Sequence, residues 1–551
     1  MQILDKRWIS SLKNVPSIGN FIKQQLSLIT SIVILWIIVA ILLVISVKKN
    51  QGHIVYAIDD AYIHMAIAKN LAQNGVWGVT KYGFSSSSSS LLYTLLISVI
   101  YFITGVNEVT PFILNIIFAT LTIVLIFIIL RRYKLNSFWS FIILLSVIFF
   151  TPLPALIFSG MEHTLQILLT IFFVYSSVII LSKKKPAFLE YSILLILAFF
   201  ITATRYEGLF LILVVSILLI IKKEWLYSFF LLIIGIMPLA IYGIISISKG
   251  WYFLPNSVLL KSNVLLYPGI TRFLIHSVGQ IIKTPHIYVL VAVALVLLII
   301  QYKKHNYFWK ETTIMLVIFI VTTLLHMIFA RTGWFFRYEA YLIALGIVVV
   351  GINLHEYFPE RLSVIFNKSL PLKKFLIILV ILIISLPLAQ RGLTSLVITP
   401  QATNNIYEQQ YQMGLFLKNY YIGEYIAAND IGAIDYFGEV RLLDLEGLGS
   451  LEVAKAKMGE SYDTKAISEL ANRKEVKIAL VYDQWYDKYG GIPQNWTKVG
   501  EWKIQNNVVT AGDTVSFYAI FEDENKLIRN LQLFSSNMPR DIIQTGKYIK
   551  P

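Results

Sequence analysis

The chain has 551 residues, of which 57% are hydrophobic, and its mean hydropathy is +0.69. This composition excludes an ordinary soluble protein and indicates a polytopic helical membrane protein. Residues 1–390 carry 30 Lys and Arg against 12 Asp and Glu, whereas residues 391–551 carry 17 against 20. A basic excess confined to a membrane region reflects the orientation of the helices and contact with anionic lipid head groups. Nucleic acid is therefore excluded as a partner. The absence of cysteine excludes disulfides and thiolate catalysis.

Apolar segments of roughly 15–20 residues recur along the first 390 residues, a length that matches the hydrocarbon core of a bilayer. They predict about eleven membrane-spanning helices, near 28–47, 111–130, 138–151, 164–181, 187–203, 207–221, 226–247, 286–301, 312–330, 338–353 and 375–390. The first segment is too long for a signal-peptide core and lacks a small-residue cleavage site, so we expect it to be retained.

A shorter apolar segment at 91–104 decides the orientation. If the N-terminus is cytoplasmic and this segment does not cross, 19 Lys and Arg of residues 1–390 face the cytoplasm and 11 face outside. If the segment crosses, the two counts reverse. The positive-inside rule favours the first arrangement, so we predict a helix lying in the outer interface. The first external loop (48–110) and everything after residue 391 then lie outside the cell.

The acidic pair Asp59-Asp60 lies in this external loop, where a helical pattern begins. Capping of that helix explains one carboxylate, and we assign it to Asp60. Adjacent carboxylates raise each other's pKa, which suits a general base near neutral pH, and we assign that role to Asp59. Taken alone, the pair favours cap and catalyst equally. His64 follows on the same helical face, where a structural role is favoured over donation to a phosphate.

Further polar residues are predicted on the same outer side. Glu162 stands at a helix mouth, where a cap and a functional role are equally favoured. Arg205 and Glu207 interrupt two apolar segments, and an ion pair of little energetic value is the simpler interpretation. Arg337 recurs on this side, and two converging arginines would suit a phosphate. The aromatic loop 251–257 fits an interfacial belt or a surface for a lipid head group or sugar.

Residues 391–551 have the composition of a soluble domain. Segments 424–429, 440–443 and 477–482 predict short strands, and 450–458 and 464–472 predict helices, so we expect a small extracytoplasmic α/β domain. The turns after 429 and 444 are acidic, and a structural role for them is favoured over chemistry. The chain has no Walker loop, HExxH motif or serine-hydrolase elbow, which leaves ATP-driven and zinc-protease mechanisms without support.

In order and sidedness, these motifs resemble the GT-C superfamily of polyprenyl-phosphate-sugar-dependent glycosyltransferases, especially its arabinofuranosyltransferase-like and protein-mannosyltransferase-like members. The resemblance covers nearly the whole chain. It is carried by the acidic pair, a small helix and a serine stretch, then by Gly160-Met161-Glu162, 204–208, Pro255-Asn256 with Lys261, and Arg337-Tyr338. The family's Ser-Ser-Pro-Leu stretch lacks its proline here, so we expect serines 85–90 to form a flexible turn.

The resemblance implies inverting transfer of a sugar from a polyprenyl-phosphate carrier to the hydroxyl of an extracytoplasmic glycan, lipid or protein. It makes Asp59 the general base and places Arg205 and Arg337, with His64 or Lys261, at the leaving phosphate. It adds three further substrate-binding residues, Glu162, Glu207 and Asn256. No cofactor is certain, and a divalent cation stays open. It divides the chain into a GT-C-like membrane domain (1–390) and the extracytoplasmic domain (391–551).

Two other classes of function remain. A transporter or flippase of lipid-linked sugars would also place ionisable residues near a cavity, with charges or Gly and Pro breaks at mid-membrane in repeated halves. A non-catalytic membrane scaffold could present the C-terminal domain without any chemistry. Few mid-membrane charges occur in this chain, and its acidic residues cluster at helix mouths.

Overall fold

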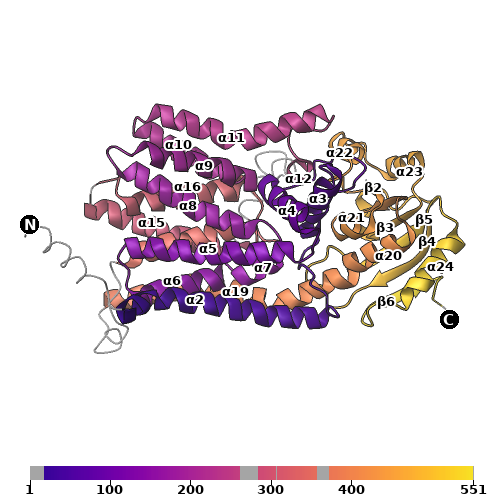
Figure 1. Cartoon of the computed structure of the whole chain (residues 1–551), viewed down its shortest axis with the longest axis horizontal. Helices are drawn as coiled ribbons and strands as arrows, with labels where there is room; N and C mark the ends of the chain where they lie inside the picture. Colours follow the sequence, from indigo (N-terminus) through magenta and orange to yellow (C-terminus); the bar gives the residue numbers. More distant parts are fainter. Residues whose placement is uncertain (1–17, 261–278, 280–282, 306, 356–371, 550–551) are drawn as a thin grey trace, which may run out of the picture.

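The computed structural model describes residues 18–260, 279, 283–305, 307–355 and 372–549. The described chain forms a bundle of long helices with a smaller domain, built around one sheet, at one end (Figure 1). Two short helices, α3 (Asp60–Asn74) and α4 (Leu91–Thr104), lie between the bundle and that domain. The polar segments at the mouths of the helices therefore face the C-terminal domain.

Eleven helices of the described bundle match the predicted spans. They are α2 (Ile18–Lys49), α5 (Thr110–Arg132), α6 (Ser137–Phe150), α8 (His163–Ser182), α9 (Phe188–Thr204), α10 (Gly208–Ile221), α11 (Trp225–Ser248), α15 (Pro285–His305), α16 (Glu311–Phe329), α17 (Ala340–Leu354) and α19 (Leu372–Ile406). Six of these, namely α2, α5, α8, α11, α15 and α16, are long and apolar enough to cross a membrane by length and composition. The prediction of a polytopic helical membrane protein is confirmed.

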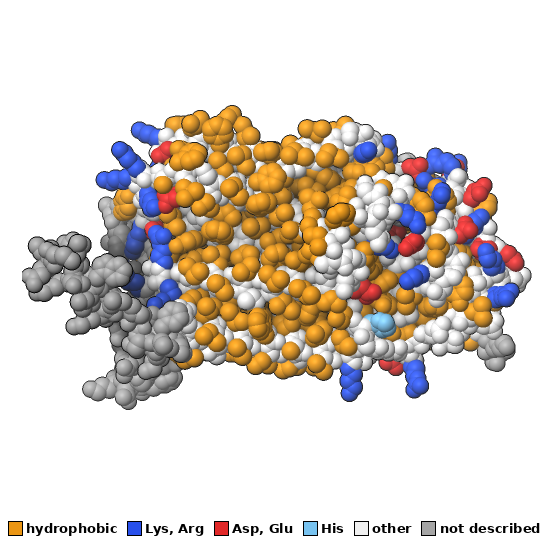
Figure 2. All heavy atoms as spheres, viewed as in Figure 1, with side chains coloured by type: hydrophobic (Ala, Val, Ile, Leu, Met, Phe, Trp, Pro, Cys, Tyr) orange, Lys and Arg blue, Asp and Glu red, His pale blue; other side chains and the backbone are white. Residues whose placement is uncertain are grey.

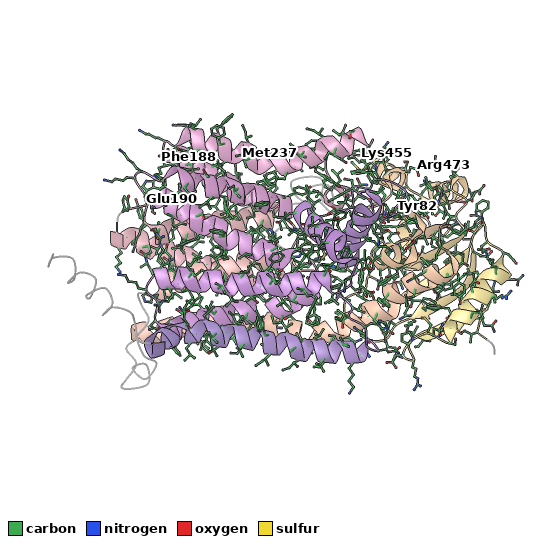
Figure 3. All side chains as sticks on the ribbon, in the orientation of Figure 1. Tyr82, Phe188, Glu190, Met237, Lys455 and Arg473 are labelled. Carbon is green, nitrogen blue, oxygen red and sulfur yellow. The ribbon has the colours of Figure 1, made fainter. Side chains whose placement is uncertain are left out.

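The surface of the bundle carries a broad apolar belt. Figure 2 shows hydrophobic side chains across the middle of the helices, with Lys, Arg, Asp and Glu gathered at both ends. Trp36, Phe229 and Met237 are among the large exposed hydrophobic residues, and Met237 lies midway along α11 (Figure 3). Exposed apolar area of this extent is stable against lipid rather than water, so the protein is a multi-pass membrane protein.

The serine run before α4 differs from the prediction. Ser85, Ser86, Ser87, Ser88 and Ser90 are buried, and their hydroxyls hydrogen-bond to one another and to neighbouring elements. The expectation of a flexible turn is therefore wrong, because these small polar side chains satisfy each other in a packed interior. The Ser90 hydroxyl accepts a hydrogen bond from the Tyr93 N–H at 3.3 Å and starts α4 in place of the missing proline.

The C-terminal domain contains a six-stranded sheet, which confirms the predicted α/β domain. The strand order is β2-β1-β3-β5-β4-β6. The strands are β1 (Tyr425–Ala428), β2 (Arg441–Asp444), β3 (Ile478–Val481), β4 (Thr497–Lys503), β5 (Thr514–Ala519) and β6 (Ile543–Gly546). The first three pair in parallel and the last three antiparallel. The carboxyl ends of β1 and β2 therefore lie side by side.

Helices cover both faces of this sheet. On one face α20 (Gln412–Tyr420) and α24 (Glu524–Ser535) contribute Met413 and Leu527 to a core that contains Ile426 of β1. On the other face α22 (Leu451–Met458) and α23 (Thr464–Arg473) contribute to a core that contains Ala427. Alternate residues of β1 thus enter opposite cores, as strand geometry requires.

The link between bundle and domain is helical. Helix α19 runs to Ile406 and continues through a π-helical turn (Tyr407–Tyr411) into α20. The expected division at residues 390 and 391 therefore falls inside a continuous helix. Because this helix belongs to both parts, it connects the sheet domain directly to the bundle.

Candidate active site

Two cavities lie where α3 meets the C-terminal domain. One of about 230 Å³, here called the bundle cavity, is lined by His64, Ser89, Arg205, Phe210 and other bundle residues. The other, of about 410 Å³ and here called the domain cavity, is lined in part by the C-terminal domain. Six residues line both cavities: Asp60, Ile63, Arg331, Arg337, Tyr338 and Leu448. The cavities are neighbours with a shared wall.

Two acids, the buried Glu162 and the partly buried Glu207, hold Arg205 at the bundle cavity. Its Nη1 contacts Oε1 of Glu162 at 2.8 Å, and its Nε and Nη2 donate to both carboxylate oxygens of Glu207 at 3.1 and 2.6 Å. Burial alone would raise the pKa of Glu207, but the paired Arg205 lowers it to about 2. Glu162 precedes α8 without capping it through its side chain, so the cap interpretation does not describe its carboxylate. Three predicted residues therefore form one network.

His64 joins this network from α3. Its Nε2 lies 3.4 Å from Oε2 of Glu162, and its Nδ1 lies 2.7 Å from the Thr94 hydroxyl. Ser89 donates to the same Glu162 at 3.2 Å. These contacts explain why α3, α4 and the serine run pack together, and they place an imidazole in the wall of the bundle cavity.

Arg337 presents a different situation, because part of its guanidinium is unsatisfied. Its Nη2 pairs with Asp60 and donates to the Tyr338 hydroxyl at 3.1 Å. The side chain is 2% exposed, and its Nε and Nη1 have no hydrogen-bond partner among the described residues. Because unsatisfied buried donors are costly, a buried guanidinium with two such nitrogens beside two cavities is suited to an anionic ligand.

Tyr338 lies between the two arginines. Its ring centroid is 5.6 Å from the Arg205 guanidinium carbon and 4.9 Å from that of Arg337. An aromatic face stabilises a nearby cation, so this tyrosine lowers the cost of bringing two positive groups to one cavity. In the sequence, Tyr338 stands out only as part of a motif. Its role could not be predicted from the sequence, because it depends on both arginines converging on the ring.

The loop that carries Arg337 has an unusual backbone. Four successive residues, Gly333 to Phe336, have positive φ angles of 80°, 41°, 52° and 60°. This conformation is disfavoured for bulky residues and persists only where surrounding contacts impose it. Here Glu339 accepts from the Gly333 N–H at 2.8 Å and pairs with Arg391 of α19 at 2.8 Å. The loop is therefore anchored on both sides of Arg337.

Asp59 and Asp60 face different partners. Asp59 occupies the N-cap position of α3 without a side-chain capping bond, and Asp60 is the first helical residue. The assignment of Asp60 as the cap is therefore wrong, because its carboxylate pairs with Arg337 instead. The Asp59 carboxylate accepts hydrogen bonds from the backbone N–H groups of Gly432 and Ala433, at 2.9 and 2.8 Å.

The surroundings of Asp59 disfavour its charged form. Burial, followed by the neighbouring Asp430 carboxylate, raises the pKa of Asp59 above the ordinary range, and the two backbone donors offset this only in part. Asp59 lines the domain cavity beside Asp60. A carboxylate of raised pKa in a cavity wall is suited to accept a proton.

Two predicted residues lie elsewhere. Asn256 is buried and donates to the Gly447 carbonyl at 2.8 Å, so it joins the bundle to the C-terminal domain and lines neither cavity. Its neighbour Ser257 does line the bundle cavity. Lys261 lies outside the described residues.

The C-terminal domain contributes residues that the sequence analysis interpreted as structural. Asp430 and Glu446 each follow a strand by two residues, at the adjacent carboxyl ends of β1 and β2, and both line the domain cavity. Ligands of open α/β sheets commonly bind at that edge. The acidic turns after these two strands could therefore have indicated a binding site from the sequence. Gln410 and Trp485, which also line this cavity, lie in segments without any such pattern.

Within the described ranges, no three or more His, Asp or Glu side chains are grouped so that they could hold a metal ion. The carboxylates at the domain cavity are instead engaged by protein donors. Asp430, for example, accepts from Gln410 at 2.9 Å and from the Tyr482 hydroxyl at 2.5 Å.

Comparison with known proteins bears on the fold. A family model described as a domain of unknown function (DUF8728) matches residues 404–518, and no curated protein matches the chain. ArnT from Cupriavidus metallidurans is similar in structure, both bound to undecaprenyl phosphate and in the apo state. In each case the TM-score is 0.50 over 88% of this chain and 97% of that chain, with identities of 11% and 10%.

Arabinofuranosyltransferase AftD from Mycobacteria gives a TM-score of 0.45 at 11% identity, over 89% of this chain and 42% of that chain. The ArnT likeness runs through both the helix bundle and the C-terminal domain, since it covers nearly all of both chains. The chain therefore shares its fold with ArnT.

Proposed function

We propose that the protein is a membrane glycosyltransferase that moves a sugar from a polyprenyl-phosphate carrier to an acceptor hydroxyl outside the cytoplasm. The observation that carries this proposal is the buried Arg337, whose Nε and Nη1 have no partner in the described chain and whose side chain lines both cavities. The fold adds support, because ArnT, with the same fold, has been solved bound to undecaprenyl phosphate.

The bundle cavity suits the donor. Arg205 and Arg337 supply positive charge for a phosphate, while Met161, Phe210 and Phe329 supply apolar wall. A lipid-linked phosphate needs both features at membrane depth. The two acids that hold Arg205 prevent its side chain from swinging away, and His64 adds a further donor or acceptor to the same wall.

The domain cavity would hold the acceptor, with Asp59 as the general base. Asp60 is less suited to this role, because its charge is already compensated by Arg337. The Asp59 carboxylate is oriented by Gly432 and Ala433, and each of its oxygens keeps a further lone pair for an acceptor hydroxyl. Asp60 acts as a positioning residue that aims the Arg337 guanidinium at the shared wall.

The proposed reaction is a single displacement with inversion. The acceptor oxygen attacks the anomeric carbon as its proton passes to Asp59, so a new carbon–oxygen bond forms. The bond between the anomeric carbon and the phosphate oxygen breaks, and its electron pair leaves with the carrier phosphate. Arg337 and Arg205 stabilise the additional negative charge on that phosphate. A divalent cation beside the phosphate stays an expectation, which loss of transfer on chelation would test.

Replacing the base tests this proposal. In lipid nanodiscs, Asp59→Asn should lower transfer from undecaprenyl-phosphate-linked sugars by about 100-fold or more, because proton abstraction is lost. Binding of undecaprenyl phosphate itself should be retained, because the carrier contacts the arginines. The exposed Asp541→Asn is the matched control and should transfer at the wild-type rate. Full transfer by Asp59→Asn would refute Asp59 as the base, whereas an absence of transfer by the folded wild-type protein would favour a transporter or a scaffold.

A further inference from the structure

The domain cavity has the characteristics of a binding site in its own right. At about 410 Å³ it falls within the range of roughly 300–1,000 Å³ that small-molecule sites occupy. Its walls come from Asp59 and the Arg337 loop on one side and from five separate segments of the C-terminal domain on the other. The proposed donor chemistry uses only the wall shared with the bundle cavity, which leaves the other walls without an assigned role.

Charge in this cavity is divided between its walls. Asp430 and Glu446 reach it from the carboxyl ends of β1 and β2, and Asp59 lies close enough for Asp430 to raise its pKa. The two cations, Arg331 and Arg337, belong to the bundle side. An acceptor held against the C-terminal domain meets Asp430 and Glu446, which accept hydrogen bonds, and none of the described lining residues on that side is a cation that could pair with an anionic group.

Gln410 provides an unused acceptor on the domain side. It is 2% exposed, and its Nε2 donates to Asp430 at 2.9 Å and to the Tyr482 hydroxyl at 3.0 Å. Its Oε1 is buried and meets no hydrogen-bond donor within the described part of the chain. Gln410 is one of the residues that line the domain cavity, and an amide whose oxygen has no donor is satisfied by a ligand that donates, such as a hydroxyl group.

Aromatic side chains complete the lining. Trp485 follows β3 and packs against Tyr482 with ring centroids 5.3 Å apart, which fixes its position. Trp334 comes from the Arg337 loop and remains 51% exposed although it lines the cavity. Rigid aromatic surfaces together with fixed hydrogen-bonding groups recognise ligands that have both an apolar and a polar face. A sugar ring has these two faces.

We infer that the C-terminal domain supplies an acceptor subsite for an uncharged carbohydrate, formed by Gln410, Asp430, Glu446 and Trp485. This inference rests on the proposed function, since it names the class of acceptor for the same reaction. The carboxylates and Gln410 accept hydrogen bonds from sugar hydroxyls, and Trp485 contacts the ring. These four residues offer no positive charge to a uronic acid or a phosphorylated sugar, so the subsite favours the neutral sugar.

The test measures binding of small glycosides to the full chain in nanodiscs by saturation-transfer NMR. The probes are a panel of neutral methyl glycosides of hexoses and pentoses. Each hexose glycoside is matched with the methyl glycoside of the corresponding uronic acid, which carries a free carboxylate. At least one neutral glycoside should bind at least tenfold more tightly than its uronate. Gln410→Ala should weaken that binding about fivefold, because one hydrogen bond is lost. Asp430→Asn should narrow the discrimination against the uronate, and Asp541→Asn should change neither value.

Two results would overturn the inference: uronates that bind as tightly as neutral glycosides, or an absence of saturable binding by every neutral glycoside. Thermal unfolding of each variant separates loss of the subsite from loss of the fold. Undecaprenyl phosphate binding, measured on the same samples, separates the two proposals. If the carrier binds and the glycosides do not, the subsite is wrong while the donor assignment stands; the reverse result removes the donor assignment alone.

Discussion

Asp59 and Asp60 are adjacent in the chain and belong to different networks. Asp60 turns toward the bundle and pairs with Arg337, whereas Asp59 turns toward the C-terminal domain and accepts from Gly432 and Ala433. A paired carboxylate orients an arginine, and a buried carboxylate beside another acid gains proton affinity. The acidic pair therefore connects the two cavities, with one member directed to each function.

A pH dependence follows at the same scale. Asp59 must be deprotonated to act as a base, so kcat should fall as the pH falls through its raised pKa. Replacing Asp430 by Asn removes the like charge, which contributes to that raised pKa after burial itself. The acid limb of the kcat profile of Asp430→Asn should therefore move to lower pH, while Asp541→Asn should keep the wild-type profile. A limb that stays in place or moves to higher pH would contradict the assignment of Asp59.

The sequence predicted which residues lie at the site, because their side of the membrane follows from nearby charges. It did not predict their partners, which come from distant parts of the chain. The positive-inside count placed Asp59, Arg205 and Arg337 on one side, and the structure brings them to the two adjoining cavities. The partners of Asp59 lie more than 370 residues away in the chain, so no spacing rule could identify them. The cap was assigned to Asp60, whereas Asp59 occupies the N-cap position and its carboxylate accepts from Gly432 and Ala433 instead of capping α3.

Among the elements, the turn between β1 and α21 (Ala433–Gly438) packs directly against Asp59. A Cβ atom on Gly432 would lie 2.2 Å from the Asp59 carbonyl oxygen and 2.5 Å from its Cγ. Only glycine permits this approach, because any side chain would force the turn and the Asp59 loop apart. The element that orients the proposed base is thus a turn of the C-terminal domain.

Gly432→Ala should consequently lower transfer by about 100-fold, the cost expected for a displacement of roughly 1 Å at a reacting group. Gly83→Ala is the matched control, because its Cβ meets nothing within 4 Å. Both variants should bind undecaprenyl phosphate like the wild type, since Arg337 is unaffected. Equal transfer rates for the two variants, measured on folded protein in nanodiscs, would show that the turn does not position Asp59.

Strands and helices with a strong local pattern were predicted within one or two residues. The segments 424–429 and 477–482 became β1 and β3, and 91–104 became α4. The serine run was misjudged because its burial depends on Tyr242, Asn256 and Leu448, which approach it from distant parts of the chain. The continuity of α19 into α20 was missed because its polar second half resembles a linker in composition.

At the scale of the whole molecule, the apolar belt separates two charged ends (Figure 2). The end opposite the C-terminal domain carries Arg132, Lys183 and Glu311, and Figure 3 shows Phe188 and Glu190 at that same end. Length and hydropathy were sufficient to predict the bundle, because each span is a local property. The packing of the sheet domain against the ends of the helices depends on contacts between distant segments and could not be predicted.

The orientation can be tested directly, because the chain has no cysteine of its own. Single cysteines at two exposed positions, Lys184→Cys and Arg473→Cys, mark the two ends of the molecule. In right-side-out vesicles an impermeant maleimide should label Arg473→Cys at once and Lys184→Cys only after permeabilisation. The opposite pattern would place the C-terminal domain and both cavities in the cytoplasm.

The position of the bound carrier phosphate is the most direct test of whether Arg337 holds the donor. We would determine the structure of the full chain in nanodiscs with undecaprenyl phosphate bound. We predict that the phosphate lies in the bundle cavity, within hydrogen-bonding distance of Nε or Nη1 of Arg337, with Asp59 across the shared wall. A phosphate bound away from both cavities, with these two nitrogens still without a ligand, would contradict it.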